Sequence, residues 1–204
     1  MTSDFSTEES AMADDVRIYK AKNNEEDFSG NLLADIEALN SHRQNGNLQK
    51  AKALGKRLAT LTPLIDSTEE EALAVDFKEL LAPKFQSQDI LFQIRVLMIF
   101  AAESLLQLKI PAPQISTTAI NAMHDALRKE HANFYKNISD GAAFTFYYLA
   151  MKKGKDLEND IGEAFAMLCS VKKNSESFIE AGKIVWETAC AVIEKEIEDA
   201  DFVL

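Results

Sequence analysis

The segment of residues 89–108, DILFQIRVLMIFAAESLLQL, constrains the fold more than any other part of the chain. Fourteen of its twenty residues are apolar, and it contains neither glycine nor proline. A helix that is apolar nearly all round is buried in a larger protein or in a membrane. Arg95 lies inside the run, and a charge at the centre of a bilayer costs at least about 2.5 kcal/mol. We therefore predict a buried central helix and no membrane span.

Arg95 is the odd residue of this helix. On a helical wheel it lies beside Leu91, Met98 and Ala102, away from the polar sector. A buried guanidinium group needs a carboxylate or carbonyl partner. Two interpretations follow: Arg95 reaches an edge or pairs with an acid of a neighbouring helix, or it binds an anion in a cavity.

Length, charge and cysteine content limit the class of protein. The chain has 204 residues, enough for one domain or a domain with a tail, and a formal net charge of −11. That charge argues against nucleic-acid binding and against adsorption to anionic lipid, because both surfaces repel an anion. Cys169 and Cys190 form no CxxC motif, which is typical of core residues in a reducing compartment. The first ten residues lack a secretory pattern, so we expect a cytoplasmic protein.

Residues 1–28 differ in composition from the rest of the chain. They hold eight acidic residues against three basic ones and are rich in serine, threonine and asparagine. Such a segment buries too little apolar surface to offset the entropy of ordering it. We predict an acidic flexible tail at 1–28 and one all-α domain at 29–204.

From residue 29 onward the apolar spacing is helical, and no strand is expected. The predicted fold is all-α, with about eight helices as antiparallel hairpins around the central helix, either as a bundle or as a short repeat-like stack. The expected helices cover 29–44, 47–61, 67–82, 89–108, 116–137, 139–153, 160–171 and the segment from 177 onward.

Residues 31–63 carry Gly46 at the turn between two helices, Ala51 in the second helix and Pro63 at its end. With these spacings the segment resembles a tetratricopeptide unit, and residues 148–168, through Gly154, Asp160 and Ala164, resemble the related Sel1-type repeat. Units of this kind generally bind peptides or partner proteins in a concave groove, so the resemblance implies an interaction module. It covers a single unit, since no repeat occurs 34 residues further on.

His124, Arg128 and His131 are predicted to share one face of the helix over 116–137, since steps of four and three residues return to the same side. The two histidines would lie about 10 Å apart along the axis, too far for one metal ion. They are interpreted as packing or edge residues, as ligand contacts, or as a general base beside an acid. Tyr147 and Tyr148 lie in an aromatic segment that either belongs to the core or lines a ligand pocket.

A basic face is predicted on the second helix, formed by Lys50, Lys52, Lys56 and Arg57 without an intervening acid. It is interpreted as a solvated face, as a salt-sensitive contact for the acidic tail, or as a phosphate site.

No nucleotide-binding, nucleophile or metal-ligand motif occurs in the sequence, so no catalytic residue, cofactor or metal is assigned. The function predicted is a non-enzymatic, cytoplasmic protein-interaction module with a protein partner. The alternatives are a helical bundle that binds a small apolar or anionic ligand, through Arg95, Tyr147 and Tyr148, and an enzyme of unrecognised chemistry. The oligomeric state is not indicated.

Overall fold

The computed structural model describes residues 25–64, 73–77, 85, 87–154, 156–169 and 176–203. The chain divides into two compact units, Met1–Glu37 and Ala38–Leu204. Helix α1 (Glu25–Gln44) crosses this boundary. Most of the predicted tail at 1–28, and the acidic half of the helix predicted at 67–82, lie outside the described residues. The fold is all-α, as predicted, with eight helices in the described part of the chain.

Helix α3 (Gln88–Lys109) is the centre of the second unit, as its sequence predicts. It begins where the side chain of Ser87 accepts a hydrogen bond from the amide of Ile90, a usual N-cap. Its residues from Val96 to Ala102 are all buried. No helix of the described residues is long and apolar enough to cross a membrane.

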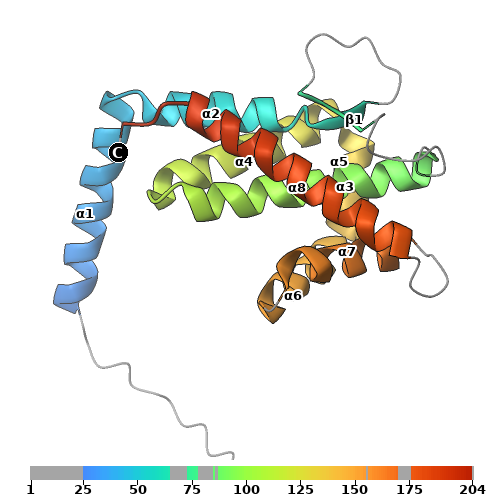
Figure 1. Cartoon of the computed structure of the whole chain (residues 1–204). Coiled ribbons are helices and arrows are strands. Elements are labelled where there is room, and N and C mark those ends of the chain that lie inside the picture. The colour runs from blue at the N-terminus through green and yellow to red at the C-terminus, as the bar shows by residue number, and fades with distance from the viewer. Residues whose placement is uncertain are drawn as a thin grey trace, which may run out of the picture. The chain divides into compact units, whose positions relative to one another are not determined.

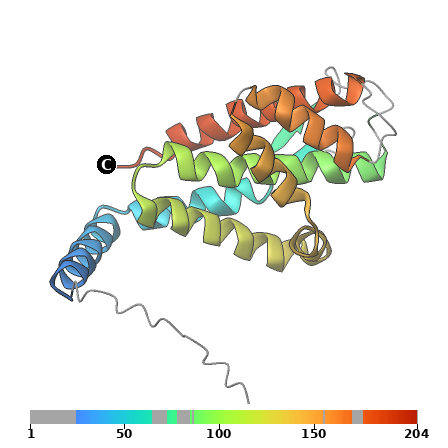
Figure 2. The same ribbon diagram turned by 90° about the horizontal axis from the view of Figure 1, so that it is seen from below.

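Helix α8 (Glu176–Asp199) runs beside α3, and α7 (Leu157–Leu168) packs on α8 (Figures 1 and 2). Glycine permits this second contact. A Cβ atom added at Gly162 would lie 2.5 Å from the carbonyl oxygen of Ile179, and one at Gly182 would lie 2.8 Å from the Cβ of Phe165. The two backbones approach closely because neither glycine carries a side chain.

Helix α2 (Asn47–Leu58) packs on α4 (Pro113–Glu130) in the same way. A Cβ atom at Gly55 would lie only 2.1 Å from the carbonyl oxygen of Ala119 and 2.9 Å from the amide nitrogen of Met123. The turn before α2 is made by Gly46, whose φ of 81° is left-handed and suits glycine.

The prediction of a helix over 67–82 is wrong in the part that the structure describes. Strand β1 (Thr62–Leu64) pairs in parallel with β2 (Ala74–Asp76), with Pro63 opposite Val75. Leu73, Val75 and Phe77 are buried. Leu73 and Phe77 are four residues apart, which fits a helical face and also one face of a strand. Val75, which is β-branched and lies between them, was the signal for the strand.

The helix predicted over 116–137 is two helices. The backbone of His131, with φ −130° and ψ 50°, leaves helical geometry between α4 and α5 (Ala132–Asp140). Neither glycine nor proline marks this break in the sequence. The break allows Phe134 of α5 to meet Phe92 of α3, with ring centroids 5.4 Å apart. Tertiary packing therefore overrides a continuous helical pattern here.

The aromatic segment of α6 (Ala143–Lys153) is only partly core. Tyr147 is fully buried, whereas Phe146, Tyr148 and Leu149 are exposed. Helix α6 ends at Gly154, which has a φ of 67° and is the left-handed C-cap that the sequence predicts.

Candidate peptide-binding groove and histidine–tyrosine cluster

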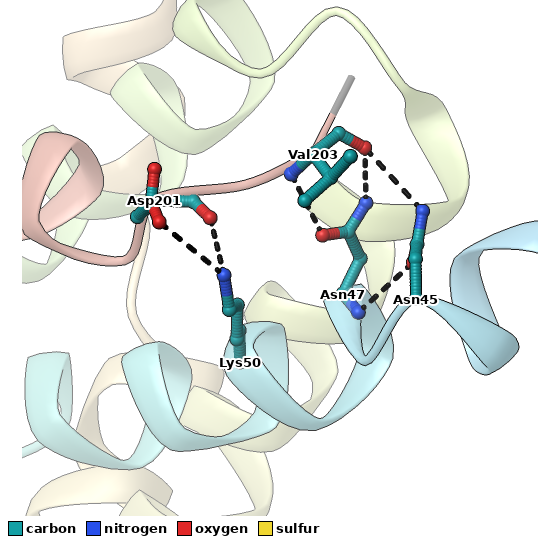
Figure 3. A network of polar contacts seen from close by, with 5 residues as sticks. All are labelled: Asn45, Asn47, Lys50, Asp201 and Val203. Carbon is teal, nitrogen blue, oxygen red and sulfur yellow. Dashed lines mark hydrogen bonds and ion pairs between the residues drawn. The ribbon is translucent and has the colours of Figure 1, made fainter.

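Residues 201–203 follow α8 and lie against the N-terminal end of α2 (Figure 3). We call this segment the strap. The side-chain amide of Asn47 meets both backbone groups of Val203: its Oδ1 accepts from the Val203 N–H at 3.0 Å, and its Nδ2 donates to the Val203 carbonyl at 2.7 Å. One amide can do this only where the N–H and C=O of a residue point to the same side, as in extended backbone.

The remaining polar groups of Asn47 are also satisfied, although the residue has no exposed surface. Its Nδ2 lies 3.2 Å from Nδ1 of His42, and its backbone N–H donates to Oδ1 of Asn45. Because an NH₂ group only donates, Nδ1 of His42 is the acceptor in this pair. The backbone of Val203 fixes the orientation of the amide, since a flipped amide would oppose donor to donor.

Two basic residues of α2 face the same side as the strap. The Lys50 ammonium donates to the carbonyl of Asp201 and lies 3.8 Å from its carboxylate (Figure 3). About two turns further along, the guanidinium of Arg57 binds the carboxylate of Glu196 on α8 at 2.7 Å. Between these pairs lies a hollow of about 540 Å³, lined by Lys50, Ala53, Leu54, Arg57, Glu196, Asp199 and Ala200. We call the hollow and the Asn47 clamp together the strap groove.

The predicted basic face is therefore divided between two surfaces. Lys52 and Lys56 line a different groove of about 530 Å³ between α2 and α4, together with Asp125, Lys129 and other residues of α4. Lys50 and Arg57, seven residues apart, point to the strap side. A contact of the basic face with residues 1–24 lies outside the described residues.

His124 and Arg128 belong to a second polar cluster. Nε2 of His124 lies 3.4 Å from Oε2 of Glu103 on α3, and its ring meets the ring of Tyr135 edge to face at 5.9 Å. The guanidinium of Arg128 donates to the Tyr135 hydroxyl at 3.3 Å and lies 5.1 Å from the ring centroid. The hydrogen bond from Arg128 is the main reason why the pKa of Tyr135 is lowered, although burial opposes it.

His131 lies at the junction of α4 and α5, where the single helix that was predicted to carry His124, Arg128 and His131 on one face is interrupted. Arg95 is half-buried, with its guanidinium 4.2 Å from the centroid of the Phe134 ring. Cation–π stacking of this kind lets a charge lie at the edge of a core. Arg95 lines neither the hollow of the strap groove nor the groove between α2 and α4, nor the pocket between α3 and α6.

The two tyrosines of α6 lie in different surroundings, because neighbouring residues of a helix point in directions about 100° apart. Burial raises the pKa of Tyr147 well above its usual value, so its hydroxyl stays protonated. Tyr148 is exposed, and Nζ of Lys152 lies 4.7 Å from its ring centroid. Tyr148 also lines a pocket of about 300 Å³ with Phe100 and Glu103 of α3.

The cysteines are free thiols. Burial raises the pKa of Cys169 and of Cys190 to about 12, which leaves little reactive thiolate near neutral pH.

Sequence reasoning missed Asn47, Asp201, Val203, Glu103 and Tyr135. Only Asn47 had a usable signal. It continues the apolar stripe of α2 at positions 47, 51, 54 and 58, so it was due to be buried and to need polar partners. Asp201, Val203 and Glu103 act through contacts between segments that are far apart in the sequence, and Tyr135 meets Arg128, seven residues away, across the break at His131.

No group of three or more histidine, cysteine, aspartate or glutamate side chains that could hold a metal ion occurs among the described residues. Comparison of the chain with protein-family models, with curated proteins and with solved structures found no match.

Proposed function

We propose that the protein is a cytoplasmic, non-enzymatic interaction module that binds an extended acidic peptide of a partner protein in the strap groove. The observation that carries this proposal is the double hydrogen bond from Asn47 to the backbone of Val203. It supplies what an extended peptide needs from a receptor, namely a donor and an acceptor side by side. The two free thiols support a reducing compartment.

The strap indicates which peptide fits. Asp201 meets Lys50, Phe202 packs on the core, and Val203 offers its backbone while its side chain stays exposed. The groove therefore accommodates an acidic residue followed by an apolar one, and then accepts any residue whose N–H is free. The adjoining hollow of about 540 Å³ leaves room for flanking side chains of a partner.

Polar contacts of this kind are exchangeable. A hydrogen bond of a folded protein contributes only about 1 kcal/mol net, because water replaces it when it breaks. A partner peptide that makes the same bonds can displace the strap. The resemblance of residues 31–63 to a tetratricopeptide unit supports the same role, since α2 belongs to that segment.

The test uses Val203→Pro, which deletes the N–H that Asn47 accepts and so weakens the strap without altering the groove. A fluorescent amidated peptide of residues 199–203, DADFV, is titrated against the full-length variant and followed by anisotropy. We expect it to bind Val203→Pro at least about tenfold more tightly than wild type, since the strap no longer competes.

Val203→Ala is the matched control, because it keeps the N–H and changes only an exposed side chain. It should behave as wild type. Adding Asn47→Ala to Val203→Pro should abolish peptide binding. The proposal is wrong if Val203→Pro fails to bind the peptide, or if the double variant binds it equally well.

A further inference from the structure

A second, independent site lies between α3 and α6. It is the pocket of about 300 Å³ that α3 lines with Phe100, Glu103, Ser104 and Gln107, and α6 with Phe144 and Tyr148. A water molecule takes up about 30 Å³ of liquid, so this volume suits a ligand of roughly ten non-hydrogen atoms.

Three rings form the apolar part of this pocket. The rings of Phe100 and Phe144 meet edge to face with centroids 5.5 Å apart, and the Tyr148 side chain is more than half exposed at the pocket. An aromatic face carries partial negative charge and attracts cations. Tyr148 already shows this property, because the ammonium of Lys152 lies 4.7 Å from its ring centroid.

Among the described residues, Glu103 is the one charged residue that lines the pocket. Its side chain is 29% exposed, and its Oε2 lies 3.4 Å from Nε2 of His124. No lysine or arginine of the described residues lines the pocket. A half-buried carboxylate beside aromatic faces disfavours an anionic ligand and favours a cationic one.

Neutral polar side chains also line the pocket. Ser104 directs its hydroxyl at the sulfur of Met151, at 3.5 Å, and Gln107 carries an amide that can donate or accept. One carboxylate, three rings and a few neutral polar groups form a receptor for a compact ligand with one positive charge.

We propose that this pocket binds a small organic cation, with its ammonium group on Glu103 and its apolar part against Phe100, Phe144 and Tyr148. The site lies outside the strap groove, and none of the described residues lines both. Its occupation therefore does not depend on the peptide-binding function.

The test compares three probes of similar shape on the full-length protein at neutral pH: benzylamine, benzyltrimethylammonium and benzyl alcohol. Binding is followed by NMR chemical-shift changes. We expect at least one of the two cations to bind about tenfold more tightly than the alcohol, because only a cation gains charge attraction from the carboxylate. The two cations separate an ammonium that donates hydrogen bonds to Glu103 from one held by charge and ring contact alone.

Glu103→Gln keeps the shape of the side chain and removes its charge. It should lower cation affinity about tenfold and leave the alcohol unchanged. Glu163→Gln, which removes a carboxylate on α7 that lies outside the pocket, is the matched control and should change neither. Tyr148→Leu, at an exposed position where folding is not at risk, should also weaken the cation.

The proposal is overturned if the alcohol binds as tightly as both cations, or if none of the probes binds at about 10 mM. It is also overturned if Glu103→Gln folds and leaves cation affinity intact. If Glu103→Gln does not fold, Tyr148→Leu decides: an unchanged cation affinity in that variant refutes the site.

Discussion

The two sides of α2 hold their neighbours by different means. Toward α4, the backbone of Gly55 lies so close to that of Ala119 that no Cβ fits between them. Toward the strap, Asn47 and Lys50 reach a short segment through directional polar contacts beside a hollow of about 540 Å³. One helix of twelve residues thus makes a closely packed backbone contact on one side and polar contacts on the other.

This difference indicates which of the two contacts water or a partner peptide can replace. Burying apolar surface contributes roughly 25 cal/mol per Å², and close packing cannot be reproduced by water or by a passing peptide. Hydrogen bonds to a peptide backbone can be reproduced by either. The α4 side therefore fixes α2 in place, and the strap side presents it for binding.

The largest effect is expected at Gly55. Gly55→Ala places a Cβ 2.1 Å from a backbone carbonyl oxygen, and the helices must separate to admit it. The gain in helix propensity of about 1 kcal/mol is smaller than this cost. We expect a net loss of roughly 2–3 kcal/mol in the free energy of unfolding, measured by urea denaturation.

Lys52→Ala, on an exposed side of the same helix, serves as the control and should change stability by less than about 0.5 kcal/mol. An unchanged urea midpoint for Gly55→Ala would show that α2 and α4 are not in backbone contact. The two sides of α2 would then not differ in how they hold their neighbours.

Asn47 comes next. Asn47→Ala leaves the N–H of Val203 without its partner, leaves the C=O only the longer bond from Asn45, and removes the donor that faces His42. We expect a loss of about 2 kcal/mol, because the site is buried and several bonds are lost together. Amide hydrogen exchange at Val203 gives a second readout, and its protection should disappear.

Asn45→Ala removes the longer bond of 3.5 Å to the same carbonyl and the acceptor of the Asn47 backbone N–H, but it leaves both bonds from the Asn47 side chain to Val203 and should cost less. Equal losses for Asn45→Ala and Asn47→Ala would mean that the clamp is not centred on Asn47.

The Gly55 contact and the strap groove differ in how far they could be predicted from the sequence. The central helix, the turn at Gly46 and the end of α6 at Gly154 were predictable, because each depends on residues close together in the sequence. Gly55 was visible as a glycine in a helix, but its contact with Ala119 depends on a segment 64 residues away. Local patterns say that a glycine is unusual and do not say which backbone it meets.

The strap groove was less predictable still. Asn47 and Val203 are separated by 156 positions, and a side-chain amide that binds backbone leaves no pattern in the residues it binds. The strand at 74–76 and the break at His131 were missed for a related reason. Both agree with helical periodicity locally and are decided by packing across the core.

A smaller effect is expected at His42. Its Nδ1 accepts one of the two hydrogens of the Asn47 NH₂ group, and His42 is only half-buried, so water can replace part of the lost bond. His42→Phe should cost about 1 kcal/mol in urea denaturation. His42→Gln, which retains an acceptor, should recover part of the loss. If both variants match wild type, the histidine does not support the clamp.

The smallest effect is expected at Lys50, and it separates charge from hydrogen bonding on the strap side. The Asp201 side chain is 95% exposed, so its ion pair with Lys50 at 3.8 Å is screened by solvent and contributes little. Lys50→Gln should therefore change stability by less than about 0.5 kcal/mol, and raising the salt concentration should barely alter amide protection at Val203. Strong salt dependence of that protection would show that charge, and not the Asn47 amide, holds the strap. The groove would then select partner peptides by their negative charge alone, and binding would not require a free backbone N–H.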